Sequence, residues 1–251
     1  MCELFGFCAD KAYDLNAWLK EFYSHSTQHP DGWGIATFRG DTVSVEKGSC
    51  CANDSSYLKE LLSAPVVEPL LLAHIRKASV GSVQDVNSHP FTRCDEGGRC
   101  WTLIHNGTIF KSDVLEQYKA VQEGSTDSER ILLYIVDAIN ALQALLGRKA
   151  AAKERFEVVD AVIAEISPGN KTNMILCDGE QCYIHVNKPE SLHYLQMPDA
   201  VAVATQPLAG GDWQEVPLST VIAFCEGKEV FRSVDHHHIC LFTPEMPDLS
   251  A

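Results

Sequence analysis

The sequence of 251 residues lacks any long apolar run. Its longest runs, such as residues 69–73, fall far short of the roughly 20 residues that a membrane-spanning helix needs, and no charged-then-apolar leader opens the chain. Positive charge is also scarce, since 20 lysines and arginines against 34 aspartates and glutamates leave a net charge of -14. This charge opposes binding to nucleic acids and anionic membranes, so we expect a soluble, cytoplasmic protein that binds neither.

Linkers, repeats and paired cysteine motifs are missing as well. No Pro/Gly/Ser-rich segment or run of like charges divides the chain, so we expect one domain over residues 1–251. None of the ten cysteines has the two-residue spacing typical of structural zinc sites and redox pairs. Most are therefore expected to be reduced thiols in the core. The three histidines at 236–238 cannot all face one ion on a strand, which favours a solvated loop.

The chain does carry a cysteine, Cys2, directly behind the initiator methionine. Because cysteine is small, removal of Met1 is expected, and it would leave one residue with both a thiol and a free α-amine. A thiol has a pKa of about 8.5 and an α-amine one of about 7.7 to 8.0, so the amine can take the thiol proton at neutral pH. A cysteine at position two is by itself usually without catalytic meaning, and the rest of the chain must decide.

The hydrophobic pattern predicts strands, then helices, then strands again. Strands are expected at 2–7, 35–38, 42–46, 69–75, 101–105, 173–177, 182–186, 200–204 and 221–224, with a turn at Gly40-Asp41. Helices are expected at 14–24, 55–62, 127–146 and 149–165. Asp14 is a plausible cap of the first helix, and Thr126 and Glu129 form a capping box before the third. This order predicts an α+β layered sandwich, because a sheet has to bury its apolar face under helices.

Polar motifs end or interrupt the predicted strands, where a rigid scaffold often holds functional side chains. They are Asp31-Gly32-Trp33-Gly34, His74-Ile75-Arg76, Asn87-Ser88-His89-Pro90-Phe91, His105-Asn106-Gly107 and Thr126-Asp127-Ser128-Glu129. Singly, each has an ordinary explanation as a turn signal, a surfacing arginine or a helix cap. In this order behind Cys2, they resemble the class II glutamine amidotransferases, in which an N-terminal cysteine is the nucleophile.

The resemblance implies a role for each matching residue. Cys2 would be the catalytic nucleophile, and Asn106 and Gly107 would form the oxyanion hole. Arg76 would hold the α-carboxylate of glutamine, a task that suits a planar fork of donors, and Asp127 would bind the α-amine. Further residues expected around the substrate are Gly32, Trp33, Ser79, which stands where the family often has threonine, and His89.

One departure from the family concerns Lys77, which follows Arg76 where some fused members have tryptophan. Residues 77–86 would close over bound glutamine, so a different loop implies a different specificity or coupling. The motifs cover about the first 130 residues and extend loosely to 204–208, Trp213 and 224–227, as in stand-alone bacterial members of the class.

The resemblance implies the four-layer αββα sandwich of the N-terminal-nucleophile (Ntn) hydrolases. It also implies hydrolysis of the γ-carboxamide of glutamine through a thioester on Cys2, with neither a metal nor an organic cofactor. A synthase that receives the ammonia stays open as a partner.

Two other functions stay open. The same machinery would serve a γ-glutamyl amide hydrolase acting on a glutathione-like or γ-glutamyl conjugate, and the space beyond the scissile amide separates it from a glutaminase. The alternative of another class is a non-catalytic, thiol-rich module for metal binding or redox chemistry, which would make Arg76, Asn106 and Asp127 unrelated coincidences. A regulatory protein that keeps the fold without the reaction is disfavoured, because every catalytic position is filled.

Overall fold

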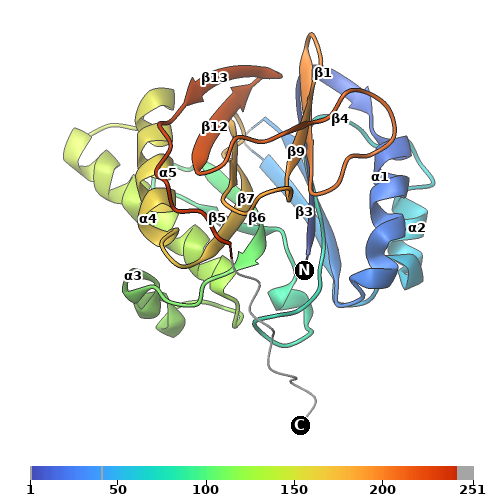
Figure 1. The fold of residues 1–251 in the computed structure, drawn as a ribbon, viewed down its shortest axis with the longest axis horizontal. Coiled ribbons are helices and arrows are strands. Elements are labelled where there is room, and N and C mark those ends of the chain that lie inside the picture. Colours follow the sequence, from blue (N-terminus) through green and yellow to red (C-terminus); the bar gives the residue numbers. More distant parts are fainter. Residues whose placement is uncertain (1, 41, 242–251) are drawn as a thin grey trace.

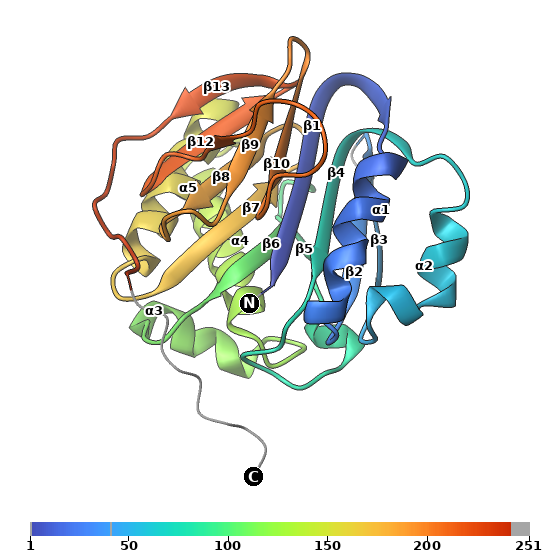
Figure 2. The ribbon, with the colours of Figure 1, turned by 45° about the vertical axis from the view of Figure 1, so that its right-hand side comes forward.

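The computed structural model of the protein describes residues 2–40 and 42–241. Two antiparallel sheets pack face to face, and helices cover their outer faces (Figure 1, Figure 2). The expected α+β class is therefore confirmed, and the layers form a four-layer αββα sandwich of the Ntn-hydrolase type. The expectations for Met1 and for Asp41 of the Gly40-Asp41 turn fall outside the described residues.

The first sheet has seven strands in the order β11-β9-β10-β1-β4-β2-β3. Their bounds are Glu3–Asp14 for β1, Trp33–Arg39 for β2, Thr42–Gly48 for β3, Val67–Ile75 for β4, His193–Gln196 for β9, Ala200–Ala204 for β10 and Gln214–Glu215 for β11. Strand β1 lies between β4 and β10, and its first residue, Glu3, pairs with Ile75. Neighbours on both sides thus hold the beginning of the chain.

The second sheet has six strands in the order β13-β12-β8-β7-β6-β5. Their bounds are Phe91–Cys94 for β5, Cys100–Thr108 for β6, Lys171–Cys177 for β7, Cys182–Val186 for β8, Thr220–Cys225 for β12 and Lys228–Arg232 for β13. The prediction that a strand ends at His105 was wrong, because Asn106 and Gly107 lie within β6. They pair there with Asn173 and Thr172 of β7, and this pairing overrides the local turn signal.

The helices are α1 (Asn16–Ser24), α2 (Ser56–Leu61), α3 (Asp113–Glu116), α4 (Asp127–Leu146) and α5 (Ala152–Ile166). Short 3₁₀ helices lie at His25–Gln28, Ala52–Asp54, Asp85–Asn87 and Gln117–Ala120. Asp14 ends β1 and its carboxylate accepts from the backbone N–H of Asn16 at 3.0 Å. Thr126 caps α4, because its hydroxyl accepts from the Glu129 N–H at 3.3 Å. The cap predicted at Thr126 is therefore confirmed, whereas the Glu129 carboxylate accepts from the backbone nitrogens of Glu123 and Gly124. The cap predicted at Asp14 was wrong, because α1 begins at Asn16 and its N-cap residue is Leu15.

Alternating side chains of β1 divide between two cores. Phe5 and Phe7 pack under α1, whereas Leu4 and Cys8 face the second sheet. A third core joins α4 and α5 to the outer face of the second sheet. Because side chains alternate along a strand, Cys2 lies on the same face as Leu4 and is directed toward the second sheet.

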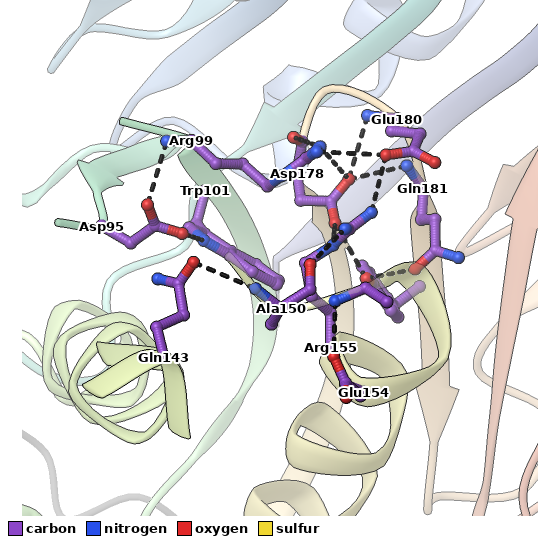
Figure 3. Close-up of polar contacts among 12 residues, drawn as sticks. Asp95, Arg99, Trp101, Gln143, Ala150, Glu154, Arg155, Asp178, Glu180 and Gln181 are labelled. Carbon is purple, nitrogen blue, oxygen red and sulfur yellow. Dashed lines mark hydrogen bonds and ion pairs between the residues drawn. The ribbon is translucent and has the colours of Figure 1, made fainter. Parts of the chain in front are cut away.

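An ion-pair network ties α5 to the turn between β7 and β8 (Figure 3). Arg155 donates from Nε to Asp178 Oδ2 and from Nη2 to Glu180 Oε2, both at 2.7 Å. Arg99 donates to the Asp178 carbonyl oxygen at 3.1 Å. These contacts hold the C-terminal end of β7, which begins at Lys171 and ends at Cys177.

The cysteines follow the expectation in part. Cys94 and Cys100 lie opposite each other on β5 and β6 and form a disulfide that the sequence did not predict. Four cysteines of the described residues are buried thiols, Cys8, Cys177, Cys182 and Cys240. Residues 236–238 lie in a loop, as expected.

The described part of the chain has neither a membrane-spanning helix nor a cluster of metal-ligating side chains. Across residues 2–40 and 42–241, no helix is long and apolar enough to cross a membrane. Within the same residues, no three His, Cys, Asp or Glu side chains converge closely enough to hold a metal ion.

Candidate active site

The thiol of Cys2 lies against the segment that follows β4. Its Sγ atom is 3.4 Å from the backbone nitrogen of Lys77 and 3.4 Å from the carbonyl oxygen of the same residue. Burial raises the pKa of the Cys2 thiol, although the Lys77 backbone and the charges of Lys171 and Arg76 act to lower it. The thiol is therefore protonated near neutral pH and needs a base before it can act as a nucleophile.

Asn106 approaches the same region from the second sheet. Its side chain lies on the face of β6 that carries Ile104, which packs between the two sheets. Lys171 Nζ donates to Asn106 Oδ1 at 2.9 Å, so the amide oxygen faces β7. The side chain of Cys2 is thus directed from the first sheet toward the second, and the side chain of Asn106 is directed from the second sheet toward the first.

Gly107 is required by close packing. A Cβ atom at this position would lie 1.9 Å from the carbonyl oxygen of Lys171 and 2.2 Å from Nε2 of His105, so a larger residue does not fit. His105 is held by α4 and β7, because Nδ1 is 2.9 Å from Ser128 Oγ and Nε2 is 3.2 Å from the Lys171 carbonyl oxygen. A carbonyl only accepts, so Nε2 carries the hydrogen and Nδ1 accepts from Ser128. Burial lowers the pKa of His105, which keeps the ring neutral.

Arg76 organises the segment that follows it. Its Nη1 atom donates to the carbonyl oxygen of Ser82 at 3.0 Å, and Nη2 donates to those of Val80 and Gly81 at 3.0 and 3.1 Å. The backbone nitrogen of Arg76 donates to the carbonyl oxygen of Gly32 at 2.8 Å. In this structure the guanidinium therefore holds segment 77–86 against the site, and Gly32 positions Arg76 through its backbone.

Asp127 and Ser79 both reach the residues that follow Gly107. Asp127 Oδ2 accepts from the backbone nitrogen of Ile109 at 2.7 Å, and Ser79 Oγ lies 3.4 Å from Thr108 Oγ1. Burial lowers the pKa of Arg76, and the charges of Cys2, Asp31 and Asp127 oppose this change. The expected nucleophile and the two expected substrate-binding charges are thus close enough to influence one another.

His89 and Trp33 have other surroundings. The His89 ring stacks on His74 with centroids 4.1 Å apart, and no ring nitrogen of either histidine has a hydrogen-bond partner among the described residues. Burial lowers the pKa of both rings, so both are neutral. Trp33 packs in the core under α1 against Tyr23 and Tyr57. Substrate contacts of His89 and Trp33 stay predictions.

Two residues of this site were not predicted, Ser128 and Lys171. Ser128 lies within the capping-box motif but has no chemical signal of its own. Lys171 precedes an apolar strand and so looks like an exposed residue in the sequence. Only the register, which places Lys171 opposite Thr108, brings its side chain to Asn106.

Comparisons with known proteins identify the family to which the chain is similar. A family model described as "Glutamine amidotransferases class-II" matches residues 1–200. YafJ of Escherichia coli, provisionally named a glutamine amidotransferase, is 28% identical over 259 residues, covering 92% of this chain and 100% of that protein.

Solved structures share the fold. A predicted glutamine amidotransferase from Pseudomonas aeruginosa matches with a TM-score of 0.63 and 21% identity, covering 92% of this chain and 100% of that one. Glutamine phosphoribosylpyrophosphate amidotransferase from B. subtilis matches with a TM-score of 0.68 and 17% identity, covering 92% of this chain and 49% of that enzyme. At these identities the structural matches show the fold alone.

Proposed function

Because this chain belongs to the class II glutamine amidotransferases, we propose that it hydrolyses the γ-carboxamide of glutamine, or of a small γ-glutamyl amide, through a thioester on Cys2. The observation that carries the proposal is the meeting of three distant segments at one place. The Cys2 thiol contacts Lys77 beside Arg76, while Lys171, whose charge acts on that thiol, bonds Asn106.

The reaction follows from these residue types. With Met1 removed, the α-amine of Cys2 takes the thiol proton, and the thiolate attacks the amide carbon. The oxygen that gains the charge is met by Nδ2 of Asn106 and the backbone N–H of Gly107, and one such donor contributes about 2.7 to 4 kcal/mol in comparable enzymes. The ammonium of Cys2 returns its proton to the leaving nitrogen, ammonia departs, and water hydrolyses the thioester to glutamate. An ammonia-accepting synthase is the partner that this reaction would serve.

Selectivity for a γ-glutamyl group comes from binding the other end of the amino acid. Arg76 would take the α-carboxylate and Asp127 the α-amine, which fixes the amide relative to Cys2. The guanidinium already donates to carbonyl oxygens of segment 77–86 through Nη1 and Nη2, whereas Nε donates to none of the described residues. A bound carboxylate would therefore join Arg76 and the segment into one closed site.

The test is glutamate release from glutamine, γ-glutamyl dipeptides and glutathione by the mature protein. Cys2→Ala should abolish release while the circular dichroism spectrum and melting temperature stay at the wild-type values. Cys50→Ala and Cys51→Ala are matched controls, because both thiols lie outside the site, and they should keep full activity. Loss in either control with retention in Cys2→Ala would move the nucleophile, and the ranking of the three substrates separates a glutaminase from a γ-glutamyl hydrolase.

A further inference from the structure

A buried lysine lies beside the expected oxyanion hole. Lys171 begins β7, is only 8% exposed, and donates from Nζ to Asn106 Oδ1 at 2.9 Å. Lysine is rarely buried, because an ammonium loses much of its hydration free energy when it leaves water. The sequence offers no reason for a lysine here, but the chemistry of a carboxamide does.

A side-chain amide can present either its oxygen or its nitrogen, because the two ends have nearly the same shape. An ammonium only donates, so the atom of Asn106 that faces Lys171 has to be the oxygen. The nitrogen then lies on the opposite side of the carboxamide, where it donates to none of the described residues. An amide turned the other way would bring a lone pair, rather than a donor, to the developing oxyanion.

We propose that Lys171 is a positioning residue that locks the Asn106 carboxamide with Nδ2 directed into the oxyanion hole. This inference rests on the proposed function, because the hole matters only if an oxyanion forms. Lys171 also contacts the other half of the hole, since its carbonyl oxygen accepts from His105 and lies where a side chain on residue 107 would be. Lys171 therefore bonds the side chain of Asn106 and also packs against the backbone at Gly107.

The residue directly opposite Asn106 cannot do the same work. Asn173 pairs with Asn106 in the register, but its Nδ2 donates to Ser191 Oγ at 2.7 Å. Its Oδ1 accepts from the backbone nitrogen of Asn187 at 3.1 Å. Asn173 is thus committed to the loop after β8, and Lys171 is the group on β7 that bonds Asn106.

The lysine charge gives the proposal a pH signature. Burial and the nearby charge of Lys188 lower the pKa of Lys171 to about 8, and the charges of Cys2 and Cys240 act in the opposite direction. Above that pH the amine is neutral and can accept as well as donate, so it no longer specifies the amide orientation. Activity should therefore decline as the pH rises through about 8, and this decline should move to higher pH in Lys171→Arg, because a guanidinium stays protonated.

The kinetic test compares Lys171→Met with Lys171→Arg. Lys171→Met keeps the length of the stem but removes the donor, and we expect kcat for glutamine to fall about 10- to 100-fold, somewhat less than the loss of a whole oxyanion donor, with KM within about twofold. Lys171→Arg keeps a charged donor and should therefore retain most of the wild-type kcat. In an Asn106→Ala background, Lys171→Met should cost less than about twofold more, because its partner is gone. Fully additive losses would overturn the proposal.

Two measurements separate this inference from its rivals. Alkylation of Cys2 by iodoacetamide, followed by mass spectrometry, needs a thiolate but no oxyanion hole. Because the charge of Lys171 acts to lower the pKa of the Cys2 thiol, alkylation should slow in Lys171→Met, but by clearly less than kcat falls. A fall in alkylation equal to the fall in kcat would mean that Lys171 acts on the thiol, which overturns the proposal.

Nuclear Overhauser effects from the Asn106 side-chain amide hydrogens report the orientation without any turnover. In the wild type they should reach Cys2 Hβ. In Lys171→Met the amide can adopt both orientations, so they should reach both Cys2 Hβ and the side chain at position 171. Contacts from these hydrogens to Lys171 Hε in the wild type would overturn the proposal. The expected contacts in a wild type that releases no glutamate would uphold the positioning and refute the proposed function instead.

Discussion

Arg76 shows why a single guanidinium can be hard to replace. Three of its contacts are carbonyl oxygens of residues 80–82, and the proposed function adds a substrate carboxylate. Arg76→Lys keeps the charge but loses the planar fork, so it should loosen the segment and weaken carboxylate binding together. We expect kcat/KM for glutamine to fall about 10- to 100-fold, which corresponds to about 1.4 to 2.8 kcal/mol.

The control for this substitution is Arg93→Lys, since Arg93 is an exposed residue of β5. Steady-state kinetics of both variants provide the measurement, with wild-type kcat/KM expected for Arg93→Lys. Unchanged kcat/KM in Arg76→Lys would place the substrate pocket elsewhere.

The ionisation of Glu3, the first residue of β1, makes the stability of the protein depend on pH. Its buried carboxylate lies 2.8 Å from Nδ1 of His25, 3.1 Å from Nε2 of His29 and 2.9 Å from Nε2 of Gln206. Burial by itself would raise the pKa of Glu3, but the hydrogen bonds and charges of the two histidines outweigh it and lower the pKa. A carboxylate with a lowered folded pKa stabilises the protein above its unfolded pKa, which is about 4.3 for glutamate.

We therefore expect the stability contributed by Glu3 to be lost as the pH falls below about 4.3 and through the lower folded value. Denaturant unfolding of wild type and Glu3→Gln between pH 3 and pH 7 measures this contribution as a difference in free energy of unfolding. Glu157→Gln, on the exposed face of α5, is the matched control. A difference between wild type and Glu3→Gln that does not change with pH would contradict the assignment.

At the scale of the elements, the packing of α5 against the turn between β7 and β8 depends on the buried ion pair of Arg155 and Asp178. Asp178 has a fully buried side chain, and its partner Arg155 is 5% exposed. Asp178→Ala leaves the guanidinium without its main counter-charge, which typically costs about 3 to 5 kcal/mol. The melting temperature and the free energy of unfolding should both fall. Glu157→Ala, which removes an exposed pair with Lys153 on the same helix, should cost less than about 1 kcal/mol. Equal effects of the two substitutions would refute a structural role for the buried pair.

The elements also show what a sequence pattern can and cannot predict. Strands β8 and β10 have the predicted bounds, because every side chain in them is buried and His185 of β8 alone interrupts their apolar runs. Strands β5, β9, β11 and β13 were missed, because few of their side chains are buried and their pairing comes from neighbouring strands. Strand β6 was cut short for a related reason, since the Asn-Gly turn signal is local whereas its pairing with β7 is not.

The alternation of side chains along each strand explains which of the predicted residues lie at the site. The motifs predicted Cys2, Arg76 and Asn106, and in the structure the charges of Arg76 and of Lys171, which bonds Asn106, act on the Cys2 thiol. Trp33 pairs with Ile75, one residue before Arg76, so its side chain is on the opposite face and enters the core under α1. Lys171 could not be predicted, because its role depends on a contact 65 residues away in the chain.

At the scale of the whole molecule, the fold brings four chain regions to one place. The start of β1, the segment after β4, the end of β6 and the start of α4 lie close together. This arrangement supplies a thiol, an amide donor and substrate-binding charges. Two buried histidines, His89 and His105, belong to the polar motifs of this site and are the imidazoles to consider as bases for the thiol.

Neither histidine is suited to that task. Nδ1 of His105 accepts from Ser128, and its Nε2 donates to the Lys171 carbonyl, so no lone pair of its ring is left for a thiol. His89 is 4% exposed and stacked on His74, and burial holds its pKa far below neutral. The α-amine of Cys2 is therefore the base that the proposed mechanism needs, and it exists only after Met1 has been removed.

A residue retained ahead of Cys2 turns that amine into an amide, which has no basicity near pH 7. We expect a cleavable N-terminal tag to give a folded protein whose glutamate release is about 100-fold or more below that of the processed chain, because general-base catalysis contributes about that much. Proteolysis that exposes Cys2 should restore activity, and a C-terminal tag should be tolerated. Full activity with the N-terminal tag in place would eliminate the α-amine as base, and the thiol would then require a rearrangement that frees His89 or His105.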